Sequence, residues 1–114
     1  MTEQGTFGPV VRGEAAAWRA LPYPGVSVKV LRNDKDTGDG AFLLKFDAGA
    51  WFPAHHHPGG EHVFVLEGDL LIGRDRLTAG DYLYTPPNGT HAASSEGGCV
   101  FITTLPKPIE ILGD

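Results

Sequence analysis

Three consecutive histidines, His55–His57, lie between two stretches of strand-like sequence, and they constrain what this chain can fold into more than any other feature. Side chains alternate between the two faces of a strand, so His55 and His57 point to one side and His56 to the other. The segment Pro58–Gly60 consists of turn-forming residues and reverses the chain. Glu61 then begins a second apolar run, where it can face the same two histidines across a hairpin.

Two imidazoles and a carboxylate that converge from paired strands form part of a divalent-metal site. His91 is a fourth candidate, because it follows a second turn with the sequence PPNG. Adjacent histidines also occur in solvated loops and in affinity tags, but a tag would be terminal and would lack flanking strand-like sequence. The residues therefore predict one divalent metal ion, with the ligands His55, His57, Glu61 and His91.

The donor atoms restrict which metals can bind but do not identify one of them. Three nitrogens and one oxygen suit Zn, Fe, Ni, Mn, Co or Cu. Four ligands leave an octahedral ion two positions for water or substrate, as is typical of a reactive or ligand-binding site. Cys99, the single cysteine, lies outside the histidine segment and is expected in the core.

Length, charge and cysteine content limit the architecture and the partners. The 114 residues suffice for one domain. The formal net charge of −5, without a Lys/Arg cluster, argues against nucleic acid and anionic membranes as partners. No apolar run approaches the ~20 residues that span a bilayer. One cysteine excludes an internal disulfide and the N-terminus lacks a secretion signal, so we expect a cytoplasmic protein.

Turn-forming residues are spread along the chain and separate many short apolar stretches, since it contains 16 glycines and 9 prolines. Strands are predicted at 26–30, 41–47, 50–57, 61–67, 70–72, 76–78, 82–85, 91–94 and 99–105. Gly68 and Asp69 are expected to form a tight turn. Residues 14–20, EAAAWRA, are the only helix-forming stretch and predict a small N-terminal helical turn.

This pattern predicts an all-β protein, a closed antiparallel barrel or jelly roll. We expect a single domain over residues 1–114. It comprises an N-terminal arm (1–25), the barrel (26–105) and a tail strand (106–114).

The strand that begins at Glu61 has two faces of different character. If Glu61 points inward to the metal, the valines that alternate with it do so too, whereas His62, Phe64 and Leu66 point outward. An outward Phe and Leu need cover, which the N-terminal segment with Trp18 or a second subunit could supply. We favour a homodimer, and we expect the apolar tail to add an edge or exchanged strand at that contact.

The histidine segment and the second turn together resemble the two motifs of the cupin superfamily. The first motif is matched by Gly49, His55, His57, Glu61 and Gly68, and the second by Gly80, Pro86 and His91. Asn88 stands where the second motif usually has glycine, and asparagine tolerates the left-handed conformation. The resemblance implies an RmlC-like jelly-roll β-barrel (a double-stranded β-helix) with the same four ligands.

The peptides GGEHVFVLEGDL, YTPPNGTH and SSEGGCVF are similar to the cupin domains of ChrR-type anti-sigma factors, a branch that includes small dioxygenase-like enzymes. The resemblance covers residues 18–107. It implies metal-dependent oxidative cleavage or isomerisation of a small carbonyl-bearing or phenolic molecule, such as a β-diketone or a hydroxyacetophenone. A non-catalytic, metal-containing sensor or binding module is the alternative.

Aromatic residues on the predicted strands are candidates for lining a substrate pocket beside the metal, with ordinary core packing as the alternative for each. They are Phe46, Trp51, Tyr82 or Tyr84, and Phe101. A cationic metal in an apolar barrel would bind an anionic enolate, phenolate or carboxylate and would act on it as a Lewis acid. His56 faces away from the metal, and an acid–base role beside the ligands is open for it and for Tyr84.

Overall fold

The computed structural model describes Gly5 and residues 8–112, and almost all of its regular structure is antiparallel β-sheet. The elements are the 3-10 helix η1 (Gly13–Ala15) and the strands β1 (Arg19–Ala20), β2 (Val26–Asn33), β3 (Gly40–Phe46), β4 (Trp51–His57), β5 (Glu61–Ile72), β6 (Asp75–Thr78), β7 (Tyr82–Thr85), β8 (Gly89–Ser94), β9 (Cys99–Leu105) and β10 (Glu110–Ile111). No helix within this described part of the chain is long and apolar enough to cross a membrane.

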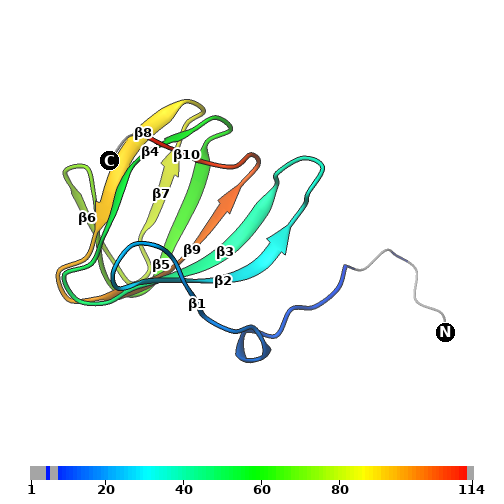
Figure 1. Cartoon of the computed structure of the whole chain (residues 1–114), viewed down its shortest axis with the longest axis horizontal. Helices are drawn as coiled ribbons and strands as arrows, with labels where there is room; N and C mark the ends of the chain where they lie inside the picture. Colours follow the sequence, from blue (N-terminus) through cyan, green and yellow to red (C-terminus); the bar gives the residue numbers. More distant parts are fainter. Residues whose placement is uncertain (1–4, 6–7, 113–114) are drawn as a thin grey trace.

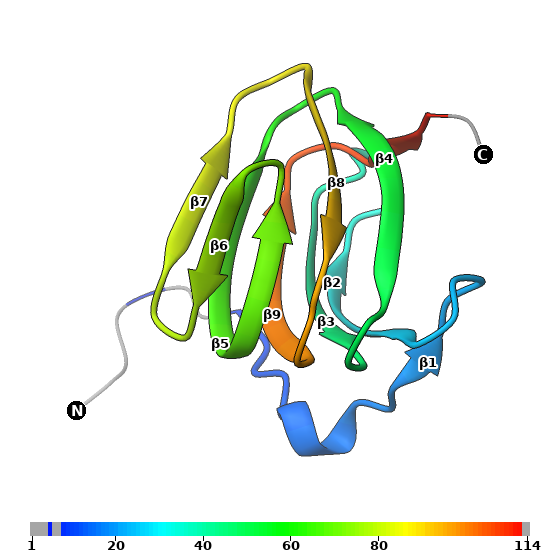
Figure 2. The ribbon, with the colours of Figure 1, turned by 90° about the vertical axis from the view of Figure 1, so that its left-hand side faces the viewer.

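The strands form one curled sheet in the order β1-β2-β3-β9-β5-β8-β4-β10, with β6 and β7 paired to β5 (Figure 1). The first half of β5 pairs with β7 and β9, and its second half pairs with β6 and β8. Strand β5 therefore joins the half of the barrel that contains β2, β3, β7 and β9 to the half that contains β4, β6 and β8 (Figure 2). The predicted all-β barrel is confirmed.

Strand β5 continues through Gly68 and Asp69, so the prediction of a tight turn there is wrong. Gly68 has a φ of 77°, which bends the strand between the two halves of the barrel without ending it. A Cβ at this position would collide with the carbonyl oxygen of Gly98. Glycine is therefore needed here for two reasons: it allows the bend, and it allows the backbone to approach the start of β9 closely.

The predicted helix over residues 14–20 is also wrong beyond its first turn. Only the 3-10 helix η1 forms, and Arg19–Ala20 pairs with β2 instead. The Trp18 ring lies 4.9 Å from Lys29 Nζ and 4.8 Å from Lys45 Nζ, measured to the ring centroid. These contacts with β2 and β3 favour an extended segment over a short helix.

The predicted faces of β5 are confirmed. Val63 and Val65 are buried in the core, whereas Phe64 and Leu66 are exposed. Each fully buried valine of this kind contributes about 1.5–3 kcal/mol to folding. Trp18 lies over β2 and β3, and the exposure of Phe64 and Leu66 shows that it does not cover them.

The tail forms an edge strand, as expected, but at a different place. Strand β10 pairs with β4, with Glu110 opposite His56 and Ile111 opposite His55. The Leu112 N–H also donates to the carbonyl oxygen of Ala54 at 2.9 Å. The tail therefore extends the half of the barrel that contains the histidines and lies at the opposite end of the strand order from β1.

Candidate metal centre

Strand pairing brings the predicted ligands together from three strands. His55 and His57 point inward from β4, and the register of β4 with β8 places His55 directly opposite His91. Glu61 is the first residue of β5, immediately after the turn that follows His57. One ligand atom from each of the four side chains lies within 4.8 Å of every other.

The two turns that the motifs contain fix the positions of these strands. Gly60 has a φ of 82°, and a Cβ there would lie 2.7 Å from the carbonyl oxygen of Thr85. Asn88 has a φ of 69°, so it adopts the left-handed conformation expected of it. The Asn88 N–H donates to the carbonyl oxygen of His57 at 2.7 Å, which links the second turn to the first.

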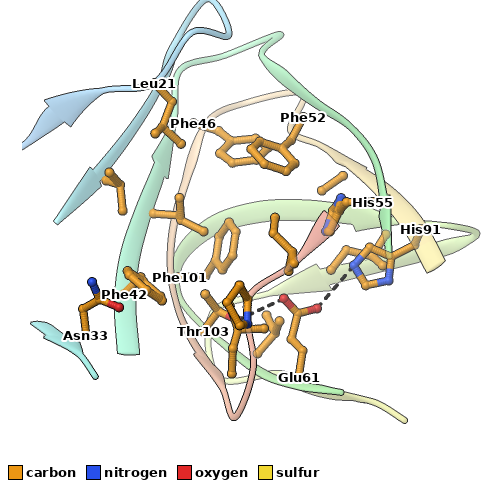
Figure 3. A pocket seen from close by; sticks show the side chains of 18 of the residues that line it. Leu21, Asn33, Phe42, Phe46, Phe52, His55, Glu61, His91, Phe101 and Thr103 are labelled. Atoms are coloured by element: carbon orange, nitrogen blue, oxygen red, sulfur yellow. Dashed lines mark hydrogen bonds and ion pairs between the residues drawn. The ribbon is translucent and has the colours of Figure 1, made fainter. Parts of the chain in front are cut away.

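The distances within the cluster suit a single ion. Oε1 of Glu61 lies 3.2 Å from Nε2 of His57. It also lies 3.3 Å from Nε2 of His91 (Figure 3). Ligands at about 2.0–2.1 Å from an ion lie at most about 4.2 Å apart. Donor atoms within 4.8 Å of one another therefore need to move inward by only a few tenths of an ångström to surround one ion.

Backbone carbonyls orient two of the imidazoles. Nδ1 of His55 lies 2.8 Å from the carbonyl oxygen of Pro53, and Nδ1 of His57 lies 2.8 Å from that of Gly89. Each Nδ1–H therefore donates outward, and the unprotonated Nε2 is free to act as a ligand. Nε2 of His57 is buried and has no well-formed hydrogen bond to any described residue, as expected of a metal ligand.

Burial and mutual contact set the charges of the cluster. Burial lowers the pKa of His55 to about 4. Burial raises the pKa of Glu61, but the neighbouring His57 and His91 outweigh it and bring that pKa down to about 2. Burial lowers the pKa of His57, but the neighbouring Glu61 and the Gly89 carbonyl raise it by more, so this pKa lies above its ordinary value. At neutral pH the site thus contains a carboxylate and a neutral His55, the forms that bind metal.

Two threonines hold the Glu61 carboxylate. The Thr103 hydroxyl of β9 donates to Oε2 of Glu61 at 3.0 Å, and the Thr85 hydroxyl of β7 donates to Oε1 at 3.4 Å. Both hydroxyls are buried with the carboxylate. The sequence does not reveal these two contacts with Glu61, because they depend on how β7 and β9 pair with β5.

Three members of the cluster, His55, Glu61 and His91, form one wall of a cavity of about 270 Å³ inside the barrel (Figure 3). Its lining is mostly apolar and includes Leu44, Val63, Phe42, Phe46, Phe52 and Phe101. The polar side chains among the described lining residues are Asn33, His55, Glu61, His91 and Thr103. The cavity therefore joins a polar, metal-binding wall to an apolar chamber.

Two of the predicted pocket aromatics line this cavity, and the others do not. Phe46 and Phe101 face the cavity with their rings 5.6 Å apart. Trp51, Tyr82 and Tyr84 are exposed on the outside of the barrel, so the prediction of inward side chains is wrong for them. For β7 the reason is alternation: Thr85 points inward to Glu61, which sends both tyrosines outward.

A β-bulge in β4 accounts for Trp51. The β4–β8 register shifts between Phe52 and His55, so the alternation from the histidines does not extend to Trp51. Phe52 lines the cavity instead, with its ring 4.9 Å from that of His55. Pro53 lacks an N–H for the ladder and is the sequence signal that could have predicted the bulge.

His56 points away from the ligand cluster, as strand alternation predicts. Its Nδ1 lies 2.7 Å from Oε1 of Glu110 in the tail strand, and its Nε2 lies 3.1 Å from Oδ1 of Asn88. These contacts connect the tail to the second turn, outside the cavity. Neither His56 nor Tyr84 contacts the ligand cluster in the structure, and Tyr84 lies instead against His62.

Comparison with known proteins decides the family. A family model described as the ChrR cupin-like domain matches residues 8–107. The chain belongs to the ChrR cupin-like family. The predicted cupin fold and its branch are thereby confirmed, and the cluster described above occupies the positions of the two cupin motifs.

One curated relative of this cupin is a much longer protein. The DNA damage-repair/toleration protein DRT102 of Arabidopsis thaliana is 31% identical over 87 residues, which are 71% of this chain and 27% of that protein. The chain thus spans about a quarter of the length of that curated relative.

Two solved structures show the same fold. An acetylacetone dioxygenase from Acinetobacter johnsonii superposes with a TM-score of 0.86 at 17% identity, over 100% of this chain and 84% of that one, and shows the fold alone. The anti-sigma factor ChrR in complex with SigE of Rhodobacter sphaeroides superposes with a TM-score of 0.70 at 29% identity, over 82% of this chain and 50% of that one.

The threonine contacts make a prediction for this cupin. Replacing Thr103 by valine removes the hydroxyl that holds Oε2 of Glu61, and we expect zinc affinity to fall by about 10-fold, as is typical when a partner of a ligand is lost. Thr104→Val, on the outer side of the same strand, is the matched control and should leave affinity unchanged. Competition with a chromophoric chelator measures both variants. Equal affinities for the two would show that the Thr103 hydroxyl does not position Glu61.

Proposed function

We propose that this cupin is a mononuclear, divalent-metal-dependent enzyme that oxidatively cleaves or isomerises a small carbonyl-bearing or phenolic molecule. One observation supports the proposal above all others: three of the four clustered candidate ligands, His55, Glu61 and His91, line a cavity of about 270 Å³. A purely structural metal site is closed by its ligands, whereas a site on a cavity wall leaves room for a guest.

The lining restricts the chemistry of that guest. The cavity is slightly smaller than the range of roughly 300–1,000 Å³ typical of ligand pockets, which favours a small molecule. Among the described lining residues there is no lysine, arginine or aspartate, so a phosphate or a second carboxylate would find no charged partner. A 1,3-dicarbonyl or an ortho-hydroxyketone fits better, because it presents two oxygens on one edge and is otherwise apolar.

Some residues of the chain would bind the metal ion, and others would orient a ligand or hold the substrate. His55, His57, Glu61 and His91 would hold the ion. When bound, a divalent ion supplies Lewis-acid stabilisation of charge on substrate oxygens and, as iron(II), redox chemistry. Thr103 fixes the Glu61 carboxylate at 3.0 Å. The phenyl rings around the chamber would hold the apolar part of the substrate and exclude water from it.

Oxidative cleavage of a 1,3-diketone needs dioxygen as the oxidant. One carbon–carbon bond of the diketone breaks, and both oxygen atoms of O₂ appear in the two carbonyl-containing products. The diketone supplies the four electrons that O₂ accepts, so no further reductant is required. Isomerisation needs only proton movement between carbon and oxygen and consumes no dioxygen.

An oxygen-electrode assay tests the proposal. Untagged protein loaded with iron(II) is given a panel of β-diketones, from acetylacetone to phenyl-substituted analogues, and a panel of hydroxyacetophenones. We expect oxygen uptake and product formation in equal amounts, or an isomer without oxygen uptake, and loss of turnover in His57→Ala. No turnover with any of the six candidate metals would contradict an enzymatic function.

A metal-containing sensor is the second candidate, supported by the family and by the 29% identity to the anti-sigma factor ChrR. A sensor would bind one of the same small molecules stoichiometrically and release it unchanged. Isothermal titration followed by product analysis separates the two functions, because only the enzyme forms product. For either function we propose a cytoplasmic location, on the ground of the single cysteine.

A further inference from the structure

A β-bulge near the end of β2 determines which of its side chains faces the cavity. Alternation from Val28, which lines the cavity, would send Arg32 inward and Asn33 outward. The register of β2 with β3 shifts between Val30 and Arg32, so one extra residue is inserted there. Beyond the bulge the alternation is reversed, and Asn33 lines the cavity instead of Arg32.

This reversal keeps a charge out of the cavity wall. Nε of Arg32 lies 3.1 Å from Oδ2 of Asp39, and its Nη2 lies 3.6 Å from Oδ2 of Asp34, with the Arg32 side chain 60% exposed. A guanidinium on the cavity wall would favour an anionic guest. The Asn33 amide is neutral and can both donate and accept a hydrogen bond.

Strand register places Asn33 across the cavity from the metal ligands. Asn33 is paired with Gly40 of β3, and Gly40 is paired with Leu105 of β9. One step beyond their last pair, the register of β9 with β5 puts Leu105 beside Glu61. Asn33 and Glu61 therefore lie at the same level of the barrel, about 14 Å apart along the sheet. Because the sheet is curled, they line opposite sides of the cavity (Figure 3).

The wall between Asn33 and the ligands offers no other polar group to a guest. The Phe42 ring covers Gly40, since a Cβ at Gly40 would lie 2.6 Å from Cε2 of that ring. The Thr103 hydroxyl is already used, because it donates to Glu61. Among the described lining residues, Asn33 is thus the one with a polar side chain outside the ligands and their hydrogen bonds.

Asn33 has no visible structural task in the turn that follows it. The N–H groups of Asp36 and Thr37 donate to Oδ1 of Asp34, at 2.9 Å and 3.2 Å, and these bonds hold the turn. Within the described part of the chain, no residue forms a hydrogen bond with the Asn33 side chain. Its amide is therefore available to a molecule in the cavity.

The cavity reaches the surface beside Asn33, which is exposed as well as part of the lining. Gly38 of the β2–β3 turn and Pro108 and Ile109 of the tail line the same end of the cavity. A Cβ at Gly38 would collide with Cδ of Pro108, so the turn and the tail are in close contact. Asn33 thus lies at the mouth, at the opposite end of a bound molecule from the metal ligands.

We propose that Asn33 determines substrate specificity by hydrogen-bonding a neutral hydroxyl or carbonyl group at the end of the substrate remote from the metal ligands. This inference rests on the function proposed above and adds a second polar group to the substrate. An apolar group at this place would leave the amide without the water that it contacts now. An anionic group would be repelled, because residues 34–39 beside the mouth contain three aspartates and one lysine.

Calorimetric titration of zinc-loaded protein tests the proposal, because zinc binds ligands without consuming dioxygen. The probes are ortho-hydroxyacetophenones that carry either a further hydroxyl or a methyl group of similar size, meta or para to the acetyl group. We expect the wild-type protein to bind the hydroxylated member of at least one pair about 5-fold more tightly, as one hydrogen bond allows. Asn33→Leu should abolish this preference and still bind the methylated probes.

Arg32→Gln is the matched control, because it changes the neighbouring side chain on the outside of the barrel and should keep the preference. Circular dichroism shows whether the variants are folded, and Asn33→Ala repeats the test should Asn33→Leu fail to fold.

Nuclear magnetic resonance provides a direct second measurement. The sequence contains two asparagines, Asn33 and Asn88, and one glutamine, so few side-chain amide signals occur. The Asn33 signals are those missing in Asn33→Leu. We expect them to shift when the preferred hydroxylated probe is added to the zinc-loaded protein. The Asn88 amide, which lies outside the cavity with Oδ1 3.1 Å from Nε2 of His56, should shift less.

The outcomes separate this inference from the proposed function. Probes that bind without any preference for the hydroxyl would overturn the role of Asn33 and leave the proposed function standing. A preference that persists in Asn33→Leu, or an Asn33 amide whose signals do not move, would do the same. If no probe binds at all, the function proposed above is contradicted and this inference with it.

Discussion

His57→Ala abolishes tight metal binding, whereas His56→Ala, one residue away, leaves it unchanged. This is the largest functional effect that we expect from a single substitution. The His57 side chain is 0% exposed, its Nδ1 is held by the Gly89 carbonyl, and its Nε2 points to Glu61. Losing a ligand should cost more than the 10- to 100-fold typical of losing a ligand's partner, so we expect a loss of affinity above about 100-fold.

The comparison of these two variants is made by metal analysis after dialysis against a chelator and by competition titration with zinc. His56→Ala is the appropriate control because it removes an imidazole from the same strand. It loses the hydrogen bonds to Glu110 and Asn88 but no candidate ligand. If both variants lose the metal to the same extent, the assignment of inward and outward faces on β4 is wrong.

Gly68→Ala lowers the free energy of unfolding by about 3–5 kcal/mol or prevents folding, the largest effect on stability that we expect from a single methyl group. Two causes combine at this residue. Its φ of 77° is unfavourable for alanine by about 1–2 kcal/mol. The added Cβ would also collide with the backbone of Gly98, which cannot move without separating β5 from β9.

Gly49→Ala separates the two causes. Gly49 has a φ of 83°, but an added Cβ would meet no atom within 4 Å, so only the cost of about 1–2 kcal/mol for the left-handed conformation applies. Urea denaturation followed by circular dichroism measures both variants. Similar losses in the two would show that the approach of Gly98 to Gly68 contributes little to stability.

The sequence predicted the candidate metal centre well because most of it is local. Alternation along one strand and a three-residue turn are enough to place His55, His57 and Glu61 together. His91 required the second turn, whose Pro-Pro-Asn-Gly sequence was recognisable by itself. The inward and outward faces of β5 followed from the same reasoning, because Glu61 fixed the direction of one side chain.

What the sequence could not provide was the pairing of distant strands. The contact of Thr103 with Glu61 depends on the register of β9 with β5, which no short stretch of sequence specifies. Tyr82 was assigned to the wrong side of the barrel because nothing fixed the direction of β7. At Trp51 the alternation was interrupted by a bulge, and Pro53 was the only residue in the sequence that indicated it.

The N-terminal segment shows tertiary structure overriding local preference. Residues 14–20 favour a helix when considered alone. The structure instead places Trp18 against Lys29 and Lys45 and pairs the following two residues with β2. Similarly, the bend at Gly68 looked like a turn because the sequence does not reveal that β5 continues from one half of the barrel into the other.

The central claim is that four side chains on three strands hold one divalent metal ion at the wall of a cavity. Elemental mass spectrometry of untagged protein, prepared anaerobically so that iron(II) survives, tests it most directly. We predict close to one equivalent of a divalent transition metal per chain in the wild-type protein and almost none in His57→Ala. A wild-type protein that contains no such metal and binds neither zinc nor iron(II) on titration would contradict the account.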